Sequence, residues 1–281
     1  MMTIPAIAAD ELGKHLAGDF RRLFGSSHQD EAERLDGIAR VALECLGKSD
    51  ALYHNVEHTF LVTLVGRDII RGRMLTERLE PEDYSHLIVA CLLHDIGYVR
   101  GILKGDNNNQ FIVDADGRTI TLERGASDAA LARYHVDRSK IFVIERLGRS
   151  PTIDADRVAR AIEFTRFPAC RSAEEAPEDP EGRLVQAADL IGQLGDPLYL
   201  KKANALFYEF EEIGLNRQLG YNSPADLVER YPDFYWTSVS PQLSEAIAYL
   251  NVTAAGRQWI ANLHSHVFCV EHAYTLMGPQ R

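Results

Sequence analysis

Two histidines, His54 and His58, lie four residues apart in the segment YHNVEHT, which spans residues 53–59. Four residues make about one turn of an α-helix, so the two imidazoles are expected to project from one helix face. The apolar run FLVTLV follows, which indicates a helix that enters a core. Two imidazoles at the start of such a helix either fill a polar niche in the packing or face a metal ion and a substrate.

Two further segments place ionisable side chains within apolar sequence. The segment LIVACLLHDIGY, residues 87–98, ends in His94 and Asp95, and LVQAADLIGQLGDP, residues 184–197, carries Asp189 on an apolar helix face. Burial of a charged carboxylate costs several kcal/mol (roughly) unless a cation or hydrogen bonds offset it. Taken singly, each of these residues is also explained as a capping or hydrogen-bonded group of the core.

Together, His58, His94, Asp95 and Asp189 supply two imidazoles and two carboxylates from three expected helices. This mixture suits one or two divalent ions such as Zn²⁺, Mn²⁺, Fe²⁺ or Mg²⁺. Asp95 can bridge a second ion, and two ions about 3.5–4 Å apart can share a hydroxide that attacks phosphorus. His54 would stand beside the metal without binding it and, as an imidazolium, give its proton to a departing alkoxide.

The order H…HD…D resembles the signature of the HD-domain metal-dependent phosphohydrolases, an all-α superfamily. The wording of the motifs is similar to the cyclic nucleotide phosphodiesterase branch. That branch carries YHNxxH, then HD at the end of an apolar helix, then ADL before a short Pro-containing turn and a Tyr-bearing helix. This chain has YHNVEH at 53–58, LLHD at 92–95 and AADLIGQLGDPLY at 187–199.

The resemblance implies a reaction and a role for each residue. The reaction would be hydrolysis of a phosphodiester or phosphomonoester of a nucleotide-like small molecule, with metal-bound hydroxide as the nucleophile and His54 as the general acid. Asp95 would bridge two ions. The implied metal ligands are His58, His94, Asp95 and Asp189.

Two departures from the phosphodiesterase pattern concern the substrate. The chain continues HDIGY where the familiar eukaryotic enzymes continue HDxxH, so that Tyr98 replaces a histidine. In YPDFYWTSVSP, residues 231–241, a loose alignment puts Phe234 where those enzymes clamp a purine and Tyr231 where they hydrogen-bond it with a glutamine. Because the amide that pairs with a purine edge is missing, we carry over the metal chemistry and not the cyclic purine nucleotide.

Several other residues are candidates for metal or substrate binding. His135 is either an additional ligand, as some two-metal HD proteins have between HD and the final Asp, or a polar residue at a helix end. Arg166 is either a bidentate phosphate donor or a partner of the acidic loop at 174–182. The remaining substrate-contact candidates are Tyr53, Lys104, Thr165, Gln193, Tyr231 and Phe234.

Helical periodicity covers most of the chain and predicts one all-α, phosphodiesterase-like HD bundle over residues 1–281. We expect N-terminal helices in 1–50, the metal-site core in 51–200 and C-terminal helices in 201–281. A β-hairpin insertion is expected at 111–122, where β-formers flank an Asp-Gly turn. The expected helices lie near 9–24, 29–47, 55–75, 82–96, 124–136, 138–148, 154–165, 182–194, 197–213, 224–230, 235–250 and 253–276.

The amino-acid composition limits the kinds of binding partner and the cellular compartment that we expect for the protein. The net charge of −11, from 30 basic and 41 acidic residues, disfavours bulk DNA or RNA and leaves a small-molecule phosphoester as the expected partner. No apolar stretch approaches the roughly 18 residues of a membrane span, and the N-terminal segment lacks the pattern of a signal peptide. Cys45, Cys91, Cys170 and Cys269 are scattered, which is typical of reduced core thiols in a cytoplasmic protein.

Two alternative functions remain open from the sequence. Some HD-fold proteins bind two irons and oxidise organophosphonates or polyols, and extra ligands such as His135 would favour that chemistry. A metal-stabilised nucleotide sensor without turnover is the second alternative, although retention of His54 argues against it. The aromatic segment 207–210 is assigned either to the core or to the face of a homodimer.

Overall fold

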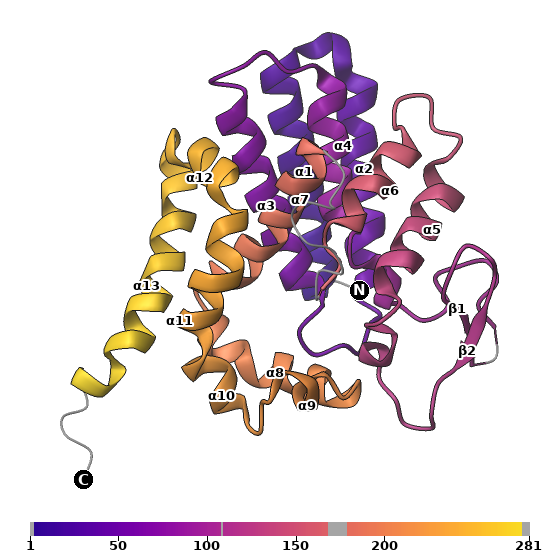
Figure 1. The fold of residues 1–281 in the computed structure, drawn as a ribbon. Helices are drawn as coiled ribbons and strands as arrows, with labels where there is room; N and C mark the ends of the chain where they lie inside the picture. The colour runs from indigo at the N-terminus through magenta and orange to yellow at the C-terminus, as the bar shows by residue number, and fades with distance from the viewer. Residues whose placement is uncertain (1–2, 108, 168–178, 277–281) are drawn as a thin grey trace.

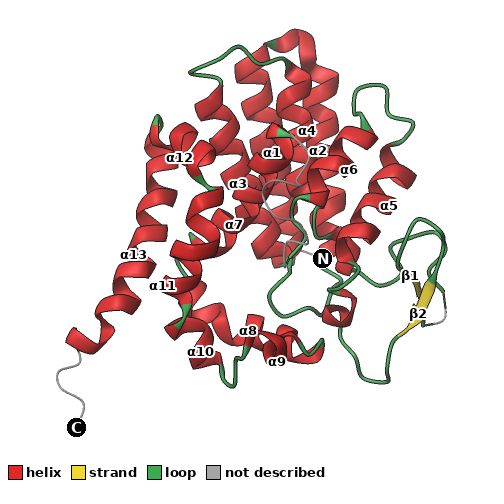
Figure 2. Ribbon diagram, viewed as in Figure 1, coloured by secondary structure: helices red, strands yellow, loops and turns green. Residues whose placement is uncertain are grey.

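The computed structural model describes residues 3–107, 109–167 and 179–276, and within them it is mostly helical with a single small hairpin (Figures 1 and 2). The all-α class with a β-hairpin insertion is therefore confirmed. None of these helices combines the length and the apolar character that a membrane crossing requires. The helices are α1 Ile4–Phe24, α2 Gln29–Leu46, α3 Val56–Arg73, α4 Pro81–Leu93, α5 His135–Leu147, α6 Ala155–Glu163, α7 Pro180–Leu194, α8 Tyr199–Glu212, α9 Leu215–Leu219, α10 Pro224–Glu229, α11 Tyr231–Phe234, α12 Ser244–Asn251 and α13 Ala254–Leu276.

The central bundle consists of α1, α2, α3, α4 and α7, whose apolar faces share one core (Figure 1). α3 packs against both α4 and α7, while α5 and α6 pair on one side of the bundle and α12 and α13 on the other. α8 and the short helices α9 and α10 lie together beneath the bundle in this view. Fully buried side chains in the core include Leu12, Leu43, Ile69, Leu92 and Ile191.

The turn that follows α4 is fixed against α5 by a glycine. Glu80 and Asp83 form a capping box at the start of α4, and the helix ends before a 3-10 turn at Ile96–Tyr98. A Cβ atom on Gly97 would lie 2.0 Å from the carbonyl oxygen of His135, so only glycine permits this approach. The backbone N–H of Gly97 donates to the Ser139 hydroxyl at 2.9 Å.

A second glycine sets the distance between α3 and α7. Asp179 caps the start of α7 by accepting from Gly182 N, and Pro180 occupies the first turn. Further along, a Cβ atom on Gly192 would lie 2.7 Å from Val62 Cγ2 and 2.8 Å from Val62 Cα. The two helices therefore approach closely at the point where α7 passes the N-terminal half of α3.

The hairpin expected at 111–122 is confirmed and consists of two short strands. β1, Gln110–Ile112, pairs antiparallel with β2, Thr119–Thr121, and Phe111 faces Ile120 across the pair. Gly117 in the turn has φ of 79°, a conformation that glycine adopts at little cost. Phe111 and Leu122 pack with Leu131 in a small apolar cluster of their own, separate from the main core.

The helix expected at 124–136 is wrong. This stretch contains a 3-10 turn, Asp128–Leu131, which Ser127 caps by accepting from Ala129 N, and α5 begins at His135. Asp128 explains the difference, since it takes part in a polar network with Arg100 and Asp50 that holds the segment in place as a loop. Tertiary contacts therefore override the local helical pattern.

The C-terminal part of the chain is divided into more and shorter helical segments than the sequence predicts. The expected helix at 235–250 is divided into a π-helical turn at Tyr235–Val239, a 3-10 turn at Ser240–Gln242 and α12. Pro241 is the physical reason, because it cannot donate a backbone hydrogen bond within a continuous helix. The short α9 was not expected from the sequence.

The cysteine and acidic-loop predictions have mixed outcomes. Cys91 is a buried thiol, as expected, and Cys45 is half-buried against the core, whereas Cys269 is exposed on α13 and is not a core residue. Cys170 lies outside the described residues, as do residues 174–178 of the expected acidic loop. The remainder of that loop is shorter than expected because α7 already begins at Pro180.

Candidate metal centre

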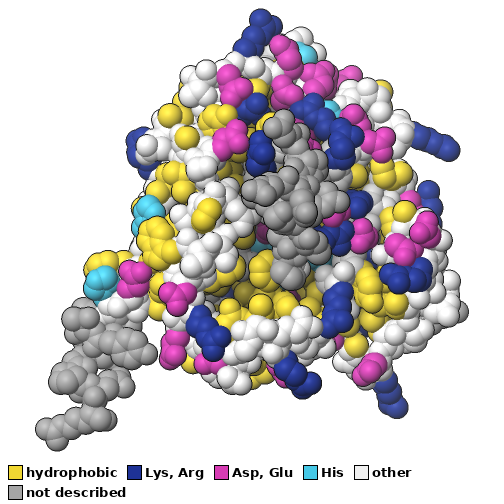
Figure 3. Space-filling model, viewed as in Figure 1, with side chains coloured by type: hydrophobic (Ala, Val, Ile, Leu, Met, Phe, Trp, Pro, Cys, Tyr) yellow, Lys and Arg dark blue, Asp and Glu magenta, His cyan; other side chains and the backbone are white. Residues whose placement is uncertain are grey.

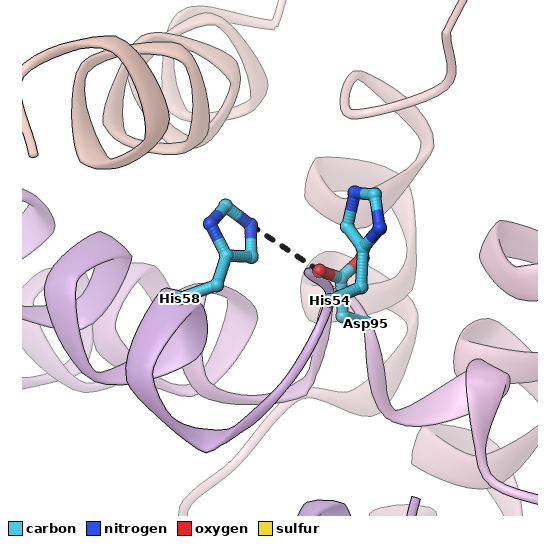
Figure 4. Close-up of side chains that lie close together, drawn as sticks. All are labelled: His54, His58 and Asp95. Carbon is cyan, nitrogen blue, oxygen red and sulfur yellow. Dashed lines mark ion pairs between the residues drawn. The ribbon is translucent and has the colours of Figure 1, made fainter. Parts of the chain in front are cut away.

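Three segments that are distant in sequence bring four side chains to one point. His58 lies in the first turn of α3, His94 and Asp95 follow α4, and Asp189 lies on α7. His58 Nε2 is 3.3 Å from Asp95 Oδ2 and 3.2 Å from Asp189 Oδ1. His94 Nε2 is 3.1 Å and 3.5 Å from the same two oxygens. We call these four residues the ligand cluster; Figure 4 shows His58 directed at Asp95.

The spacing within the ligand cluster fits donor atoms around a shared cation. His58 Nε2, His94 Nε2 and Asp95 Oδ2 are buried and make no hydrogen bond to the described residues. A tetrahedral ion with ligand bonds of about 2.0–2.1 Å separates its ligand atoms by about 3.4 Å. The observed separations of 3.1–3.5 Å match that value. A buried polar atom without a partner is costly, and a divalent ion would satisfy all three atoms at once.

The tautomer of His94 supports the same assignment. Its Nδ1–H donates to the backbone carbonyl of Cys91 at 2.9 Å, so in the neutral ring the Nε2 lone pair points toward the Asp95 and Asp189 carboxylates. That arrangement requires a cation, either a proton or a metal ion. Burial lowers the pKa of His94, but the two carboxylates outweigh it and raise that pKa well above its ordinary value.

Asp95 presents its second oxygen to another histidine. Asp95 Oδ1 lies 3.6 Å from His135 Nε2, and His135 Nδ1 is bonded to the carbonyl of Ala132 at 2.5 Å. Burial raises the pKa of Asp95, but the charge of His94 and the contact with His58 pull it well below its usual range. His135 thus has the same orientation as His94, with Nε2 directed at a ligand-cluster oxygen, and its role as an additional ligand stays a prediction.

His54 lies outside the helix that carries His58, so the expected one-turn relation on a common helix is wrong. α3 begins at Val56, and Asn55 is its N-cap, accepting from the backbone N–H groups of Glu57 and His58. The extended backbone at Asn55 nonetheless brings the two rings together, with centroids 5.4 Å apart. His54, His58 and Asp95 form a second group whose donor atoms lie close to one another (Figure 4).

A carboxylate on α8 holds His54. Glu209 Oε2 lies 2.5 Å from His54 Nδ1, and Glu209 Oε1 accepts from the backbone N–H groups of Tyr53 and His54. Burial lowers the pKa of His54, but the charge and hydrogen bond of Glu209 raise it to about 9. The ring is therefore protonated near neutral pH in the metal-free protein, and its Nε2 remains available.

Tyr98 separates His54 from His135. Its ring stacks on His54 with centroids 4.7 Å apart and on His135 with centroids 4.6 Å apart. Tyr98 therefore lies between the two imidazoles and stacks on both of them. Burial and the nearby acidic groups raise the pKa of Tyr98 well above its ordinary value, so the hydroxyl stays protonated.

The ligand cluster opens into a cavity of about 700 Å³, large enough for a small organic molecule. His54, Asp95 and Asp189 line its polar part. The predicted substrate-contact residues that also line it are Thr165, Arg166, Gln193, Tyr231 and Phe234.

Two predicted substrate-contact residues are not among the described residues that line this cavity. Tyr53 is buried and borders a smaller cavity of about 250 Å³ that His58 also lines. Lys104 is exposed, and its backbone N–H donates to Glu145 near the hairpin.

Arg166 is held by carboxylates at the cavity wall. Its Nε lies 2.6 Å from Glu163, and its Nη2 lies 2.9 Å from Asp137. Among the described residues, these two carboxylates supply compensating charge, and residues 174–178 of the acidic loop lie outside the described residues. Arg166 as a phosphate donor stays a prediction, because both partners already engage the guanidinium.

A family model with the description Npun_R2479-like matches residues 3–273. The chain belongs to the Npun_R2479-like family. No curated protein and no solved structure matches the chain significantly. The family description names no reaction, so for this Npun_R2479-like chain the resemblance to HD-domain phosphohydrolases stays a prediction, and any assignment of function depends on the geometry of the site.

The sequence reading of this Npun_R2479-like chain missed Glu209. The residue lies 155 positions after His54, within the aromatic segment FYEF that was assigned to the core or a dimer face. The sequence did contain one signal, because Glu209 is an ionisable residue between the aromatic residues Phe207 and Phe210 on an expected helix. Burial of that carboxylate requires a partner, and the structure identifies it as His54.

Proposed function

We propose that the chain is a metal-dependent phosphohydrolase that cleaves a phosphoester of a small, nucleotide-like molecule. One observation carries the proposal: buried donor atoms of His58, His94 and Asp95, which lack partners among the described residues, converge with Asp189 beside a cavity, and a His–Glu pair stands next to them. Structural polar clusters satisfy their own hydrogen bonds, whereas this cluster leaves its donor atoms free for a ligand.

The ligand cluster would hold one ion, and Asp95 together with His135 offers donor atoms for a second. An ion bound there would polarise a phosphoryl oxygen and lower the pKa of a bound water. The residues of the chain then orient the ester: Asp189 and Asp95 fix the ion's position, and the cavity beyond them receives the organic part of the substrate.

His54 would donate a proton to the leaving oxygen. Its Nδ1 is engaged by Glu209, so Nε2 is the atom left to face the substrate. Glu209 fixes the ring and favours the imidazolium, while the stack on Tyr98 fixes the ring plane. A positioned proton donor of this kind contributes about 10²–10⁴-fold to the rate.

The first experiment combines metal analysis with hydrolysis assays on four variants. We expect His58→Ala and Asp189→Ala to lose both the metal and the hydrolysis of bis-p-nitrophenyl phosphate, because each removes a ligand. We expect His54→Ala to keep the metal and to lose about 10²-fold or more in rate on an ester with a poor leaving group. The matched control is His264→Ala, which removes an exposed histidine on α13.

The pattern across leaving groups tests the acid separately from the metal. A p-nitrophenolate departs without protonation, so His54→Ala should affect that ester much less than an alkyl ester. An equal loss on both esters would contradict the acid role, and full metal content in His58→Ala would contradict the ligand assignment. Elemental analysis with assays in Mn²⁺, Mg²⁺ or Zn²⁺ would then identify the ion.

A di-iron oxygenase is the second candidate, and one observation favours it. His135 Nε2 lies 3.6 Å from the second oxygen of Asp95, which extends the donor set beyond the four expected ligands. Iron in the purified protein, oxygen consumption and absence of ester hydrolysis would favour this candidate. Loss of iron in His135→Ala, with the first ion retained, would locate the second ion there.

A further inference from the structure

The cavity beside the ligand cluster has a polar part and an apolar part. His54, Asp95 and Asp189 form the polar part. α8, α9, α10 and the residues between them contribute an apolar wall, and Figure 3 shows hydrophobic side chains around the hollow above α8 and α9 in this view. The apolar wall consists of Leu206, Phe210, Ile213, Leu215, Leu219 and Leu227.

Positive charge is scarce in this cavity. Among the described residues that line it, Arg133 and Arg166 are the basic ones. Arg166 is paired with two carboxylates, and Arg133 is exposed at the rim, where it donates to the backbone carbonyl of Ile213. Among the described lining residues, a second phosphate or carboxylate beyond the ion would therefore meet apolar surface or acidic side chains, with no unpaired buried cation to balance it.

We propose that the cavity binds the uncharged, apolar or aromatic organic group of a singly charged phosphodiester. The inference rests on the proposed phosphohydrolase function and narrows its substrate class. The ligand cluster with its ion meets the single negative charge of the diester, and the wall formed by α8, α9 and α10 meets the organic group. Nucleoside di- and triphosphates, whose extra charges would find no unpaired buried cation among the described lining residues, fall outside the proposed class.

The size of the cavity supports a bulky group. A volume of about 700 Å³ lies within the usual range for pockets that enclose small organic ligands. Transfer of a phenyl ring from water to such a wall is favoured by about 25 cal/mol for each Å² of apolar surface buried. Affinity should therefore rise with the apolar surface of the ester group and fall when a second charge is added.

Calorimetric binding to the Mn²⁺-loaded protein tests the proposal without turnover. The ligands are dimethyl phosphate, diphenyl phosphate and 4-carboxyphenyl phenyl phosphate, and analysis for released methanol or phenol after each titration checks that they stay intact. We expect diphenyl phosphate to bind at least about tenfold more tightly than dimethyl phosphate. The added carboxylate should weaken binding by at least about tenfold, because it cannot be paired in the cavity.

A pair of variants on one helix locates the binding wall. Phe210→Ala removes an aromatic ring from the wall and should reduce the preference for diphenyl over dimethyl phosphate by about threefold or more. Tyr208→Ala removes a ring of similar size that is 56% exposed and not part of the lining, and should leave the preference unchanged. If Phe210→Ala does not fold, the ligand ranking of the unaltered protein still decides the question.

The outcomes separate this inference from the proposed function. Equal binding of the two diesters, or tighter binding of the carboxylated one, would overturn the inference, and the latter would indicate Arg133 as an anion site. Hydrolysis of methyl and phenyl p-nitrophenyl phosphates with equal kcat/KM would overturn it while leaving the hydrolase intact. The expected binding order without hydrolysis of either ester would support the cavity's selectivity and overturn the hydrolase.

Discussion

Two buried charged clusters in this protein differ in how completely their polar atoms are hydrogen-bonded within the protein. The Arg138 cluster comprises Arg138, Asp106 and three backbone carbonyls, and the guanidinium makes five hydrogen bonds to them. Since a guanidinium has five N–H donors, none is left over. The ligand cluster has the opposite property, because His58 Nε2, His94 Nε2 and Asp95 Oδ2 are equally buried but make no hydrogen bond to described residues.

The difference separates a structural role from a binding role. The Arg138 cluster ties the turn at 96–98 to the loop before the hairpin, and its charge is balanced within the protein. The ligand cluster gathers donor atoms from three segments of the chain and, in the proposed function, would take its balancing cation from solution. Burial of charge is therefore not by itself a sign of function, whereas several unpaired atoms that converge beside a cavity support a binding role.

The largest expected effect on stability comes from the Arg138 cluster. Asp106→Ala leaves a fully buried guanidinium without its counter-charge, so we expect the free energy of unfolding to fall by about 3–5 kcal/mol. Urea denaturation would measure the change. Removal of the exposed partner in the Arg118–Asp114 pair on the hairpin by Arg118→Ala is the control and should cost at most about 1 kcal/mol. Equal losses in both variants would refute the contrast.

Metal should stabilise the protein through the ligand cluster alone. At a free ion concentration of 100 times Kd, binding to the folded state raises the free energy of unfolding by about 2.7 kcal/mol. We expect this gain in the unaltered protein and in Arg118→Ala, and no gain in His94→Ala. A comparison of urea denaturation with added Mn²⁺ and with chelator would measure it. A full gain in His94→Ala would show that the ion binds elsewhere.

The smallest effect concerns the pair of His54 and Glu209. The Nδ1 atom of His54 contacts Glu209, whereas its Nε2 atom remains available. Glu209→Gln removes the charge that raises the pKa of His54 to about 9, so that pKa should fall toward 6.5 in the metal-free variant. NMR titration of the ring protons would follow it. Because the folded-state pKa is raised, the pair's contribution to stability is complete below pH 6.5 and is lost as the pH rises through about 9.

An unchanged pKa in Glu209→Gln would show that Asp95 and Asp189, rather than Glu209, control the charge of His54. The conservative variant Glu209→Asp provides the matched comparison, since it keeps the carboxylate and shortens its reach. An intermediate pKa in that variant is expected. The same order should appear in the alkaline limb of the rate profile if His54 is the proton donor.

Local sequence signals predicted most of the helices and the residues of the ligand cluster. Asp154 before α6 and the apolar run before His94 are patterns that act over one or two helical turns, and the structure retains them. The segment at 124–136 failed because its conformation depends on Asp50 and Arg100, which are distant in sequence. Local periodicity contains no information about such partners.

The candidate site also divides into residues that local sequence predicts and residues whose role depends on distant contacts. His58, His94, Asp95 and Asp189 were found because each is an ionisable residue in an apolar setting, a property visible in one segment. Glu209 was missed because its role is defined by an imidazole 155 residues away. The prediction that His54 lies near His58 is confirmed, but its geometric reason was wrong. The two imidazole rings meet through the extended backbone at the start of α3 and not along a helix face.

The close contact of Gly192 with Val62 has a consequence for the width of the site. Gly192 lies one turn after Asp189 on α7, and Val62 lies one turn after His58 on α3. With backbone and side chain already touching there, the two helices cannot close further around a smaller ion. The distance between His58 and Asp189 is thus limited by a residue that has no side chain, one turn away from Asp189 on α7.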